Sequence, residues 1–181
     1  DHFNIIDAPN HRSSHSEITI RGGGVIFPIA AIFGVVLGDV NYVWFLMGLT
    51  LVSVISFWDD VINVNYIFRS VVQLFAVSLL LYQLKLHIPP YLYLLIIILI
   101  VGTINAYNFM DGINGIAGGY SLVTLGALFY INRFHYEFTS EILLVSLLIG
   151  TMVFNFFNFR NKAKCFAGDV GSVSMAFILS F

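Results

Sequence analysis

The feature that most constrains this chain is a stretch of seventeen uncharged residues from Tyr42 to Trp58, which reads YVWFLMGLTLVSVISFW. A helix of about 20 apolar residues crosses the hydrocarbon core of a membrane, so the stretch has nearly the length of a membrane span. Two aspartates, Asp59 and Asp60, follow it directly. The sequence therefore predicts a transmembrane helix that ends in a pair of carboxylates.

The rest of the chain has the same apolar character. Hydrophobic residues make up 59% of the sequence and charged residues 10%, whereas a soluble domain carries about 25% charged residues. We predict an all-α, polytopic transmembrane helical bundle with six spans and a truncated seventh, although strict counting of apolar residues gives five. The six spans are Val25–Gly38, Tyr42–Trp58, Ile67–Leu86, Tyr91–Ile104, Ile116–Ile131 and Ile142–Phe157, and the seventh is the apolar stretch after Gly171.

Alternate loops of such a bundle lie on the same side of the membrane. One side receives residues 1–24, 59–66, 105–115 and 158–170, and the other receives residues 39–41, 87–90 and 132–141. The first side carries six basic residues, counting helix ends, and the second carries two, Lys85 and Arg133. The positive-inside rule therefore predicts that the first side is cytoplasmic.

The acidic residues follow the same division. Asp7, Asp59, Asp60, Asp111 and Asp169 all fall in loops of the predicted cytoplasmic side. The acids of the opposite side stand in no recognisable pattern. Four loops that are distant in sequence thus bring carboxylates to one membrane surface.

The Asp59–Asp60 pair is a candidate metal or catalytic site. Adjacent carboxylates repel each other, and carboxylates together with substrate phosphates are the usual ligands of Mg²⁺. The alternative is a hydrated helix end. Upstream, Arg12 and Arg21 flank a hydroxyl-rich segment that ends in three glycines. Arginine forks and exposed backbone N–H groups suit phosphate, but a basic loop resting on lipid headgroups explains the segment equally well.

Amides and a further carboxylate mark the next candidate segment, NAYNFMDGINGIAGG. Asn105, Asn108 and Asp111 are spaced three residues apart and so share one side of a helix end. They could form a polar site, or they could join neighbouring helices by hydrogen bonds.

The last candidate segment is NKAKCFAGDVGS. Asp169 lies just before a predicted helix, where a helix N-terminus can bind phosphate and where aspartate is also a common N-cap. Lys164 adds positive potential, and Phe166 could pack inside the protein or stack on a base. Cys165 is the single cysteine, which rules out an internal disulfide.

Together the four segments resemble the polyprenyl-phosphate N-acetylhexosamine-1-phosphate transferase family, also known as glycosyltransferase family 4. The shared motifs, in order, are D-x-P-x-x-R-x-x-H before a glycine run, the D-D pair, N-x-x-N-x-x-D-G-x-x-G, and F-x-G-D-x-G-S. The family includes bacterial enzymes that initiate O-antigen and teichoic-acid linkage synthesis, and the muramoyl-pentapeptide translocase of peptidoglycan synthesis. RSSH followed by TIRGGG looks more like the N-acetylhexosamine branch.

The resemblance implies a reaction and a set of site residues. An N-acetylhexosamine-1-phosphate would pass from a UDP-sugar to undecaprenyl phosphate, with release of UMP and with Mg²⁺, or Mn²⁺ in its place, as cofactor. Asp59, Asp60 and Asp111 would be catalytic, and Asp60 and Asp169 would hold the metal. Phe166 would lie against the uracil, and the remaining substrate-binding residues would be Arg12, Arg21, Arg69, Asn105, Asn108 and Lys164. Whether Asp59 acts as a base or as a covalent nucleophile stays open.

The chain also departs from the family pattern. Many members carry aspartate where this sequence has Asn114, and a histidine-containing loop and a first transmembrane helix of the family are not found here. We therefore expect residues 1–181 to be a single transmembrane catalytic domain truncated at both ends. The enzyme would work at the cytoplasmic face of the bacterial inner membrane, without a nucleic-acid partner, and the resemblance allows a homodimer.

Three other readings compete with this one. A transporter would place ionisable residues near the membrane midplane, whereas the acids here crowd one end of the spans. A CDP-alcohol phosphotransferase would continue its D-G with Ala-Arg, and this chain has NGIAGG instead. A non-catalytic homologue would leave the four motifs without a reason.

Overall fold

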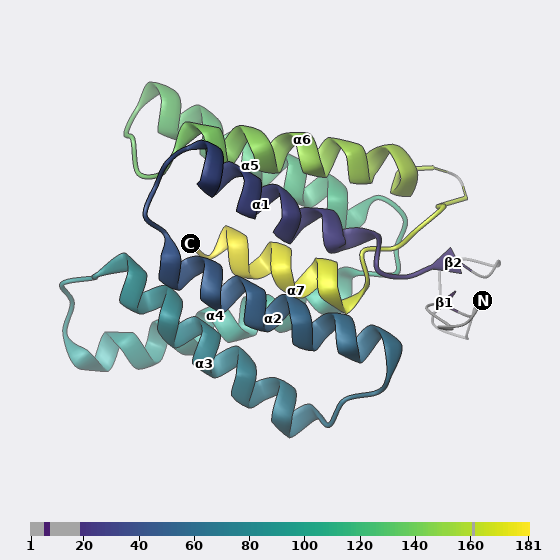
Figure 1. Cartoon of the computed structure of the whole chain (residues 1–181), viewed down its shortest axis with the longest axis horizontal. Helices are drawn as coiled ribbons and strands as arrows, with labels where there is room; N and C mark the ends of the chain where they lie inside the picture. Colours follow the sequence, from purple (N-terminus) through teal and green to yellow (C-terminus); the bar gives the residue numbers. More distant parts are fainter. Residues whose placement is uncertain (1–5, 8–18, 161) are drawn as a thin grey trace.

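The computed structural model of the chain describes residues 6–7, 19–160 and 162–181 (Figure 1). Within these residues the chain is almost entirely helical. The elements are β1 (Ile6–Asp7), β2 (Thr19–Ile20), the 3-10 helix η1 (Gly23–Val25), α1 (Ile26–Leu37), α2 (Val43–Val61), α3 (Tyr66–Leu84), α4 (Pro90–Met110), α5 (Ile116–Phe134), α6 (Glu141–Asn158) and α7 (Gly168–Leu179). The two short strands pair antiparallel, with Ile6 opposite Ile20.

Helix α7 is the centre of the bundle. Nearly all of it is buried, from Gly168 to Ile178 except for Asp169, and it packs against α1, α2, α4 and α5. Figure 1 shows α7 between a layer that contains α1 and α6 and a layer that contains α2 and α3. A helix that is apolar on every side is stable only when it is surrounded, and here protein surrounds it on most sides.

Small residues let the helices of this bundle approach closely. A Cβ added to Gly34 of α1 would lie 2.8 Å from the Leu143 Cα of α6, and one added to Gly150 of α6 would lie 2.8 Å from the Ala30 Cβ. A Cβ on Gly24 of η1 would meet the Gly171 Cα of α7 at 2.3 Å. Close backbone contacts through small residues are typical of helix packing in membranes.

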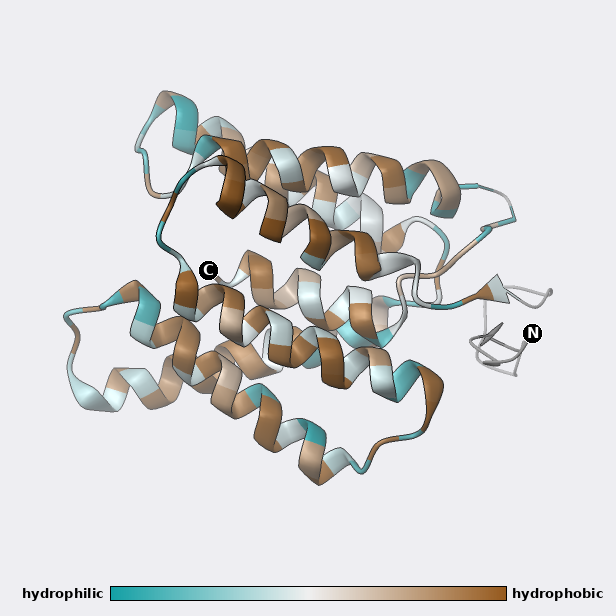
Figure 2. Ribbon diagram, viewed as in Figure 1, coloured by the Kyte–Doolittle hydropathy of each residue, from teal (hydrophilic) through white to brown (hydrophobic). Residues whose placement is uncertain are grey.

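The helices occupy the predicted positions, but their lengths do not establish six spans. Four described helices are long and apolar enough to cross a membrane, namely α2, α3, α4 and α6. The apolar segments Gly23–Leu37 and Gly168–Leu179 are shorter, and α5 is not among the four. Figure 2 shows hydrophobic residues along the bodies of the helices and hydrophilic ones at the turns. The chain is thus a helical, multi-pass membrane protein, and the six-span count stays a prediction.

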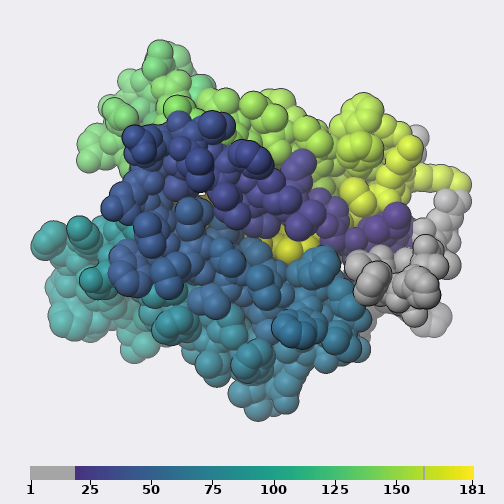
Figure 3. All heavy atoms as spheres, in the orientation of Figure 1, coloured from purple at the N-terminus to yellow at the C-terminus, as the bar shows by residue number. Residues whose placement is uncertain are grey.

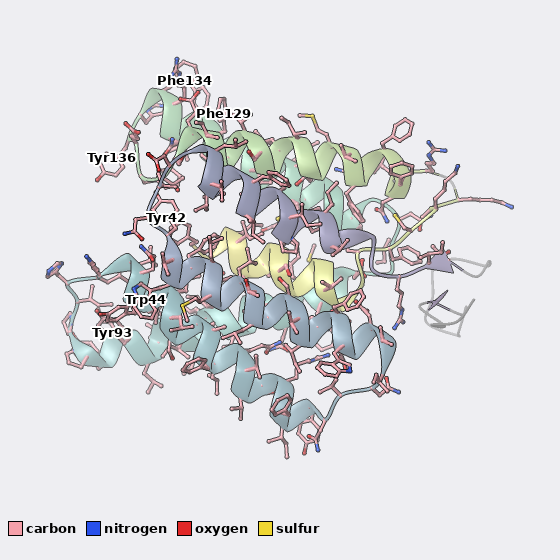
Figure 4. All side chains as sticks on the ribbon, viewed as in Figure 1. Tyr42, Trp44, Tyr93, Phe129, Phe134 and Tyr136 are labelled. Atoms are coloured by element: carbon pink, nitrogen blue, oxygen red, sulfur yellow. The ribbon has the colours of Figure 1, made fainter. Side chains whose placement is uncertain are left out.

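The turns of the bundle divide between two ends, as the alternation of loops predicted. The α2–α3, α4–α5 and α6–α7 turns lie at the end where β1 and β2 are found (Figure 1). Aromatic residues gather at the opposite end, where Figure 4 shows Tyr42, Trp44, Tyr93, Phe134 and Tyr136. Aromatic belts of this kind are typical of a membrane–water interface.

Candidate active site

The candidate site is built around the N-terminus of α7. The N-cap residue of this helix is Ala167, and no side chain of the same turn caps it. The first four N–H groups of a helix have no partner within the helix. Here two distant carboxylates accept hydrogen bonds from all four.

Asp111, just after α4, takes the first two of these N–H groups. Its Oδ1 accepts from the Ala167 N at 3.3 Å, and its Oδ2 accepts from the Gly168 N at 2.7 Å. Asp60, in the last turn of α2, takes the next two. Its Oδ1 accepts from the Asp169 N at 2.9 Å, and its Oδ2 accepts from the Val170 N at 3.0 Å.

Gly168 leaves the room that this arrangement requires. Its φ is +71°, and a Cβ there would lie 2.7 Å from the Asp60 Oδ2 and 2.8 Å from the Gly22 N. Glycine adopts a positive φ without the steric cost that other residues bear. The conformation and the space both call for glycine at this position.

Arg69 of α3 joins the remaining two aspartates. Its Nη1 donates to the Asp169 Oδ2 at 2.6 Å and also to the Asp59 Oδ2. The Asp59 Oδ1 accepts from the Val64 N at 2.7 Å, which fixes the turn between α2 and α3. One guanidinium therefore bridges two carboxylates that come from α2 and α7.

The loop before α7 is held by backbone and amide contacts. The Gly23 and Gly24 N–H groups donate to the carbonyls of Phe166 and Ala167 at 2.9 and 3.0 Å. The buried side chain of Asn158, at the end of α6, accepts from the Gly115 N at 2.8 Å and donates to the Cys165 carbonyl at 2.9 Å. These contacts fix the glycine run and the α4–α5 turn beside the α7 N-terminus.

Burial controls the protonation of two of the acids. Burial raises the pKa of Asp169 to about 7, the hydrogen bond with Asp59 and the charge of Asp60 add to the rise, and Arg69 opposes it. Burial likewise raises the pKa of Asp111 to about 6, against the N–H donors of Gly168, Ala167 and Gly112. Both groups therefore titrate near neutral pH, as is common for acids in functional sites.

The structure thus brings together the predicted residues Asp59, Asp60, Asp111, Asp169 and Arg69. Three of them differ from the prediction in their local setting. Asp59 and Asp60 lie within α2, where a loop was expected, because the helix continues past Trp58. Asp169 is a residue of the first turn of α7 and not its N-cap, and its carboxylate meets Arg69.

Other predicted residues lie farther from this cluster or make different contacts. Asn108 joins α7 through its Oδ1, which accepts from the Ser172 Oγ at 2.8 Å. Asn105 donates to the Val101 carbonyl of its own helix at 2.8 Å. Arg21 contributes a favourable charge at Asp60, and Lys164 is exposed to solvent.

The structure leaves the predicted substrate contacts of Phe166 and Arg12 untested. The side chain of Phe166 is 1% exposed, so stacking on a base would require its surroundings to open, and the predicted contact with uracil stays a prediction. Arg12 lies outside the described residues, so its predicted substrate contact has no structural counterpart here.

Two further residues contribute to the site although the sequence did not predict them as site residues. Asn158 and Ser172 bridge segments of the site, but each is a single polar residue beside an apolar run. Ser172 belongs to the F-x-G-D-x-G-S motif, which was the only available signal. Nothing near Asn158 distinguishes it from an ordinary helix end.

Metal binding depends on which carboxylate oxygens are available. Within the described segments of the chain, no three His, Cys, Asp or Glu side chains are grouped to hold a metal. Mg²⁺ is often held by only one or two carboxylates, with substrate phosphates and water completing its shell. Asp59 and Asp169 already share one positive charge, so the chemistry of this pair fits a cation. Asp60 fits less well, because both of its oxygens accept from backbone N–H groups.

An apolar groove lies beside the α7 N-terminus on the side of the bundle. It encloses about 560 Å³ between α1 and α2, and its lining includes Pro28, Val54, Phe57 and Trp58. Val170, the residue after Asp169, also lines it. In Figure 3 a small part of α7 is visible between α1 and α2.

Comparison with known proteins agrees with the motifs. The model of the family described as "Glycosyl transferase family 4" matches residues 42–181. A Bacillus subtilis protein provisionally named an undecaprenyl-phosphate N-acetylglucosaminyl 1-phosphate transferase is 27% identical over 97% of this chain and 53% of its own length. A phospho-N-acetylmuramoyl-pentapeptide-transferase of Thermotoga neapolitana is 29% identical over 89% of this chain and 58% of its own length.

An archaeal relative extends the comparison. A Saccharolobus solfataricus protein, provisionally named a UDP-N-acetylglucosamine–dolichyl-phosphate N-acetylglucosaminephosphotransferase, is 31% identical over 86% of this chain and 55% of its own length. The chain thus spans just over half the length of these relatives. The matches confirm the resemblance that the four motifs carried.

Proposed function

Because the chain belongs to glycosyl transferase family 4, we propose that its full-length protein transfers N-acetylhexosamine-1-phosphate from a UDP-sugar to a polyprenyl phosphate. UMP is the second product, and the lipid-linked sugar starts a cell-envelope glycan. Undecaprenyl phosphate is the proposed acceptor, as in the name of the Bacillus subtilis relative. The UDP donor follows the name of the archaeal relative.

The single observation that carries the proposal is the cluster at the α7 N-terminus. Four aspartates from α2, the α4 end and α7 meet there with Arg69, at one end of an apolar bundle. A lipid phosphate and a water-soluble nucleotide can meet only at such a membrane surface. The excess of Lys and Arg in the loops of this end supports a cytoplasmic orientation.

The proposed metal is Mg²⁺, and Mn²⁺ can replace it. Asp169 would hold it together with phosphate oxygens, and Asp59 lies on the other side of Arg69. When bound, the metal would neutralise the pyrophosphate of the donor. Because the pKa of Asp169 is raised to about 7, the cation has to displace a proton at acidic pH.

The residues of the chain contribute mainly by position and charge. Transfer of a phosphoryl group depends on alignment of the two phosphates and on neutralisation of the charge that builds up between them. Arg69 supplies a fixed positive charge beside Asp59 and Asp169. Arg21 adds a second positive charge on the side of the glycine run.

Product analysis tests the proposal. The full-length protein in detergent is given UDP-N-acetylglucosamine, undecaprenyl phosphate and Mg²⁺, and the lipids are analysed by mass spectrometry. We expect undecaprenyl-diphospho-N-acetylglucosamine in an amount equal to the UMP released. Assays with UDP-N-acetylgalactosamine and with the muramoyl-pentapeptide donor identify the sugar. Absence of a lipid-linked sugar with all three donors would refute the proposal.

A further inference from the structure

We propose that Asp60 and Asp111 are positioning residues that form a double carboxylate clamp on the first turn of α7, and that the clamp sets the place of Asp169. The sequence motifs suggested a direct part for both residues in chemistry or metal binding. The structure points elsewhere, because all four carboxylate oxygens are directed at backbone N–H groups. The proposal deepens the proposed function and rests on it in one respect, the assignment of Asp169 as the metal ligand.

Each carboxylate of the clamp accepts hydrogen bonds from two consecutive backbone N–H groups. Asp111 bonds the N–H groups of Ala167 and Gly168, and Asp60 bonds those of Asp169 and Val170. Asp60 thus holds the backbone on both sides of the Asp169 Cα. A rotation of this turn would move the Asp169 carboxylate away from Arg69, to which it is bonded at 2.6 Å.

Three features of the surroundings support a clamp. The turn has no local capping side chain, so its N–H groups depend on partners from other helices. Gly168 is the residue that lets the Asp60 carboxylate lie under the turn, because a Cβ would meet the Asp60 Oδ2 at 2.7 Å. Negative charge at a helix N-terminus is also favoured by the helix dipole.

The clamp connects three helices that are far apart in sequence. Asp60 is in the last turn of α2 and Asp111 directly follows α4. The position of Asp169 therefore depends on how α2 and α4 pack around α7. Asp60 acts on the metal through Asp169 and without contact of its own.

Site-resolved amide hydrogen exchange of the full-length protein without metal or substrate tests the clamp. A hydrogen bond to a charged group limits exchange, so Asp60→Ala should speed exchange at the Asp169 and Val170 amides about tenfold or more. Asp111→Ala should speed exchange at the Ala167 and Gly168 amides instead. Glu137→Ala is the control, since Glu137 is an exposed acid at the opposite end of the bundle. It should leave these four amides as they are in the unsubstituted protein.

Binding of Mn²⁺ alone, followed by electron paramagnetic resonance, tests the positioning role. Asp60→Ala should weaken Mn²⁺ binding about tenfold or more, and Asp60→Asn, which keeps one acceptor oxygen, should recover part of the loss. If exchange is faster but Mn²⁺ binding is unchanged, Asp60 caps the helix without positioning Asp169. Weaker Mn²⁺ binding with unchanged exchange would make Asp60 a direct ligand. Either result overturns the proposal.

Two precautions keep the test decisive. If Asp60→Ala does not fold, Asp60→Asn is measured instead, and faster exchange at one of the two amides is expected. Exchange and Mn²⁺ binding need no turnover. Loss of the clamp and failure of the proposed reaction are therefore distinguished by separate measurements.

Discussion

At the scale of single residues, the site depends on how a few charges are shared. Arg69 is bonded to both Asp59 and Asp169, and the side chains of all three are at most 24% exposed. Charge-assisted hydrogen bonds in partly buried surroundings are stronger than those at an open surface. Removal of Arg69 would leave both carboxylates without a compensating positive charge.

Substitution of Arg69 tests this shared charge. Arg69→Met leaves two carboxylates facing each other, so we expect UMP release to fall about 10²-fold or more, the scale seen when one preorganised electrostatic group is lost. Arg69→Lys keeps the charge but not the fork geometry and should lose less. Arg133→Met is the control, because Arg133 pairs with exposed Glu141 at the other end of the bundle. Wild-type turnover of Arg69→Met would show that Arg69 has no part in the reaction.

Protonation of Asp111 should affect stability. Burial raises its pKa in the folded protein to about 6 from a usual value of 3.8, so the folded state binds this proton more tightly than the unfolded state does. The resulting stability is fully present below about pH 4 and is lost as the pH rises to about 6.

The comparison with Asp111→Asn isolates this contribution. The unfolding temperature of the unsubstituted protein minus that of the Asp111→Asn variant should decrease as the pH rises from 4 to 6. This difference should stay constant above pH 7. A difference that does not vary with pH, measured by thermal unfolding in detergent, would show that Asp111 does not titrate in this range.

At the scale of elements, the first turn of α7 relies on glycine. Gly168→Ala places a methyl group 2.7 Å from the Asp60 Oδ2 at a φ of +71°. A left-handed conformation alone costs a residue with a Cβ roughly 1–2 kcal/mol. We expect a lower unfolding temperature and loss of most Mg²⁺-dependent UMP release.

Gly119→Ala provides the matched comparison. A Cβ at Gly119 of α5 would meet no atom within 4 Å, and alanine favours a helix by up to about 1 kcal/mol. Its unfolding temperature should be equal to or above that of the unsubstituted protein. An equal effect of the two substitutions would contradict a special requirement at Gly168.

The helices themselves could largely be predicted from the sequence. Apolar runs bounded by Asp, Asn, Gly and Pro give the positions of α1 to α7, because apolar length is what a membrane span requires. The ends were less certain. Helix α2 continues through Asp60 and α7 begins at Gly168, since contacts between helices decide where the last turns form.

The contacts within the site could not be predicted in the same way. The sequence suggested that Asp60 and Asp169 meet, but not that Asp60 bonds the Asp169 backbone 109 residues away. Local patterns carry no information about such tertiary partners. The burial of Phe166 also depends on how its loop packs. The sequence of a polar segment does not indicate whether an aromatic residue in it is buried or exposed.

At the scale of the whole molecule, the arrangement predicts a topology. Asn63, Ile113 and Lys162 are exposed in turns of the α7 N-terminal end, and Glu137 is exposed at the opposite end. Single cysteines at the first three positions, in a Cys165→Ser background, should react with an impermeant thiol reagent only from the cytoplasmic side. A cysteine at position 137 should react from outside. Labelling of residue 63, 113 or 162 in intact cells would contradict this predicted orientation.

The acids at this end of the bundle are proposed to serve the transfer of a sugar phosphate. The most direct measurement is the initial rate of UMP release by the full-length protein and its Asp169→Asn variant across a range of Mg²⁺ concentrations. We predict release that requires both undecaprenyl phosphate and Mg²⁺ and that falls about 10²-fold or more in Asp169→Asn. Equal rates for the two proteins, or release that continues without the lipid phosphate, would contradict it.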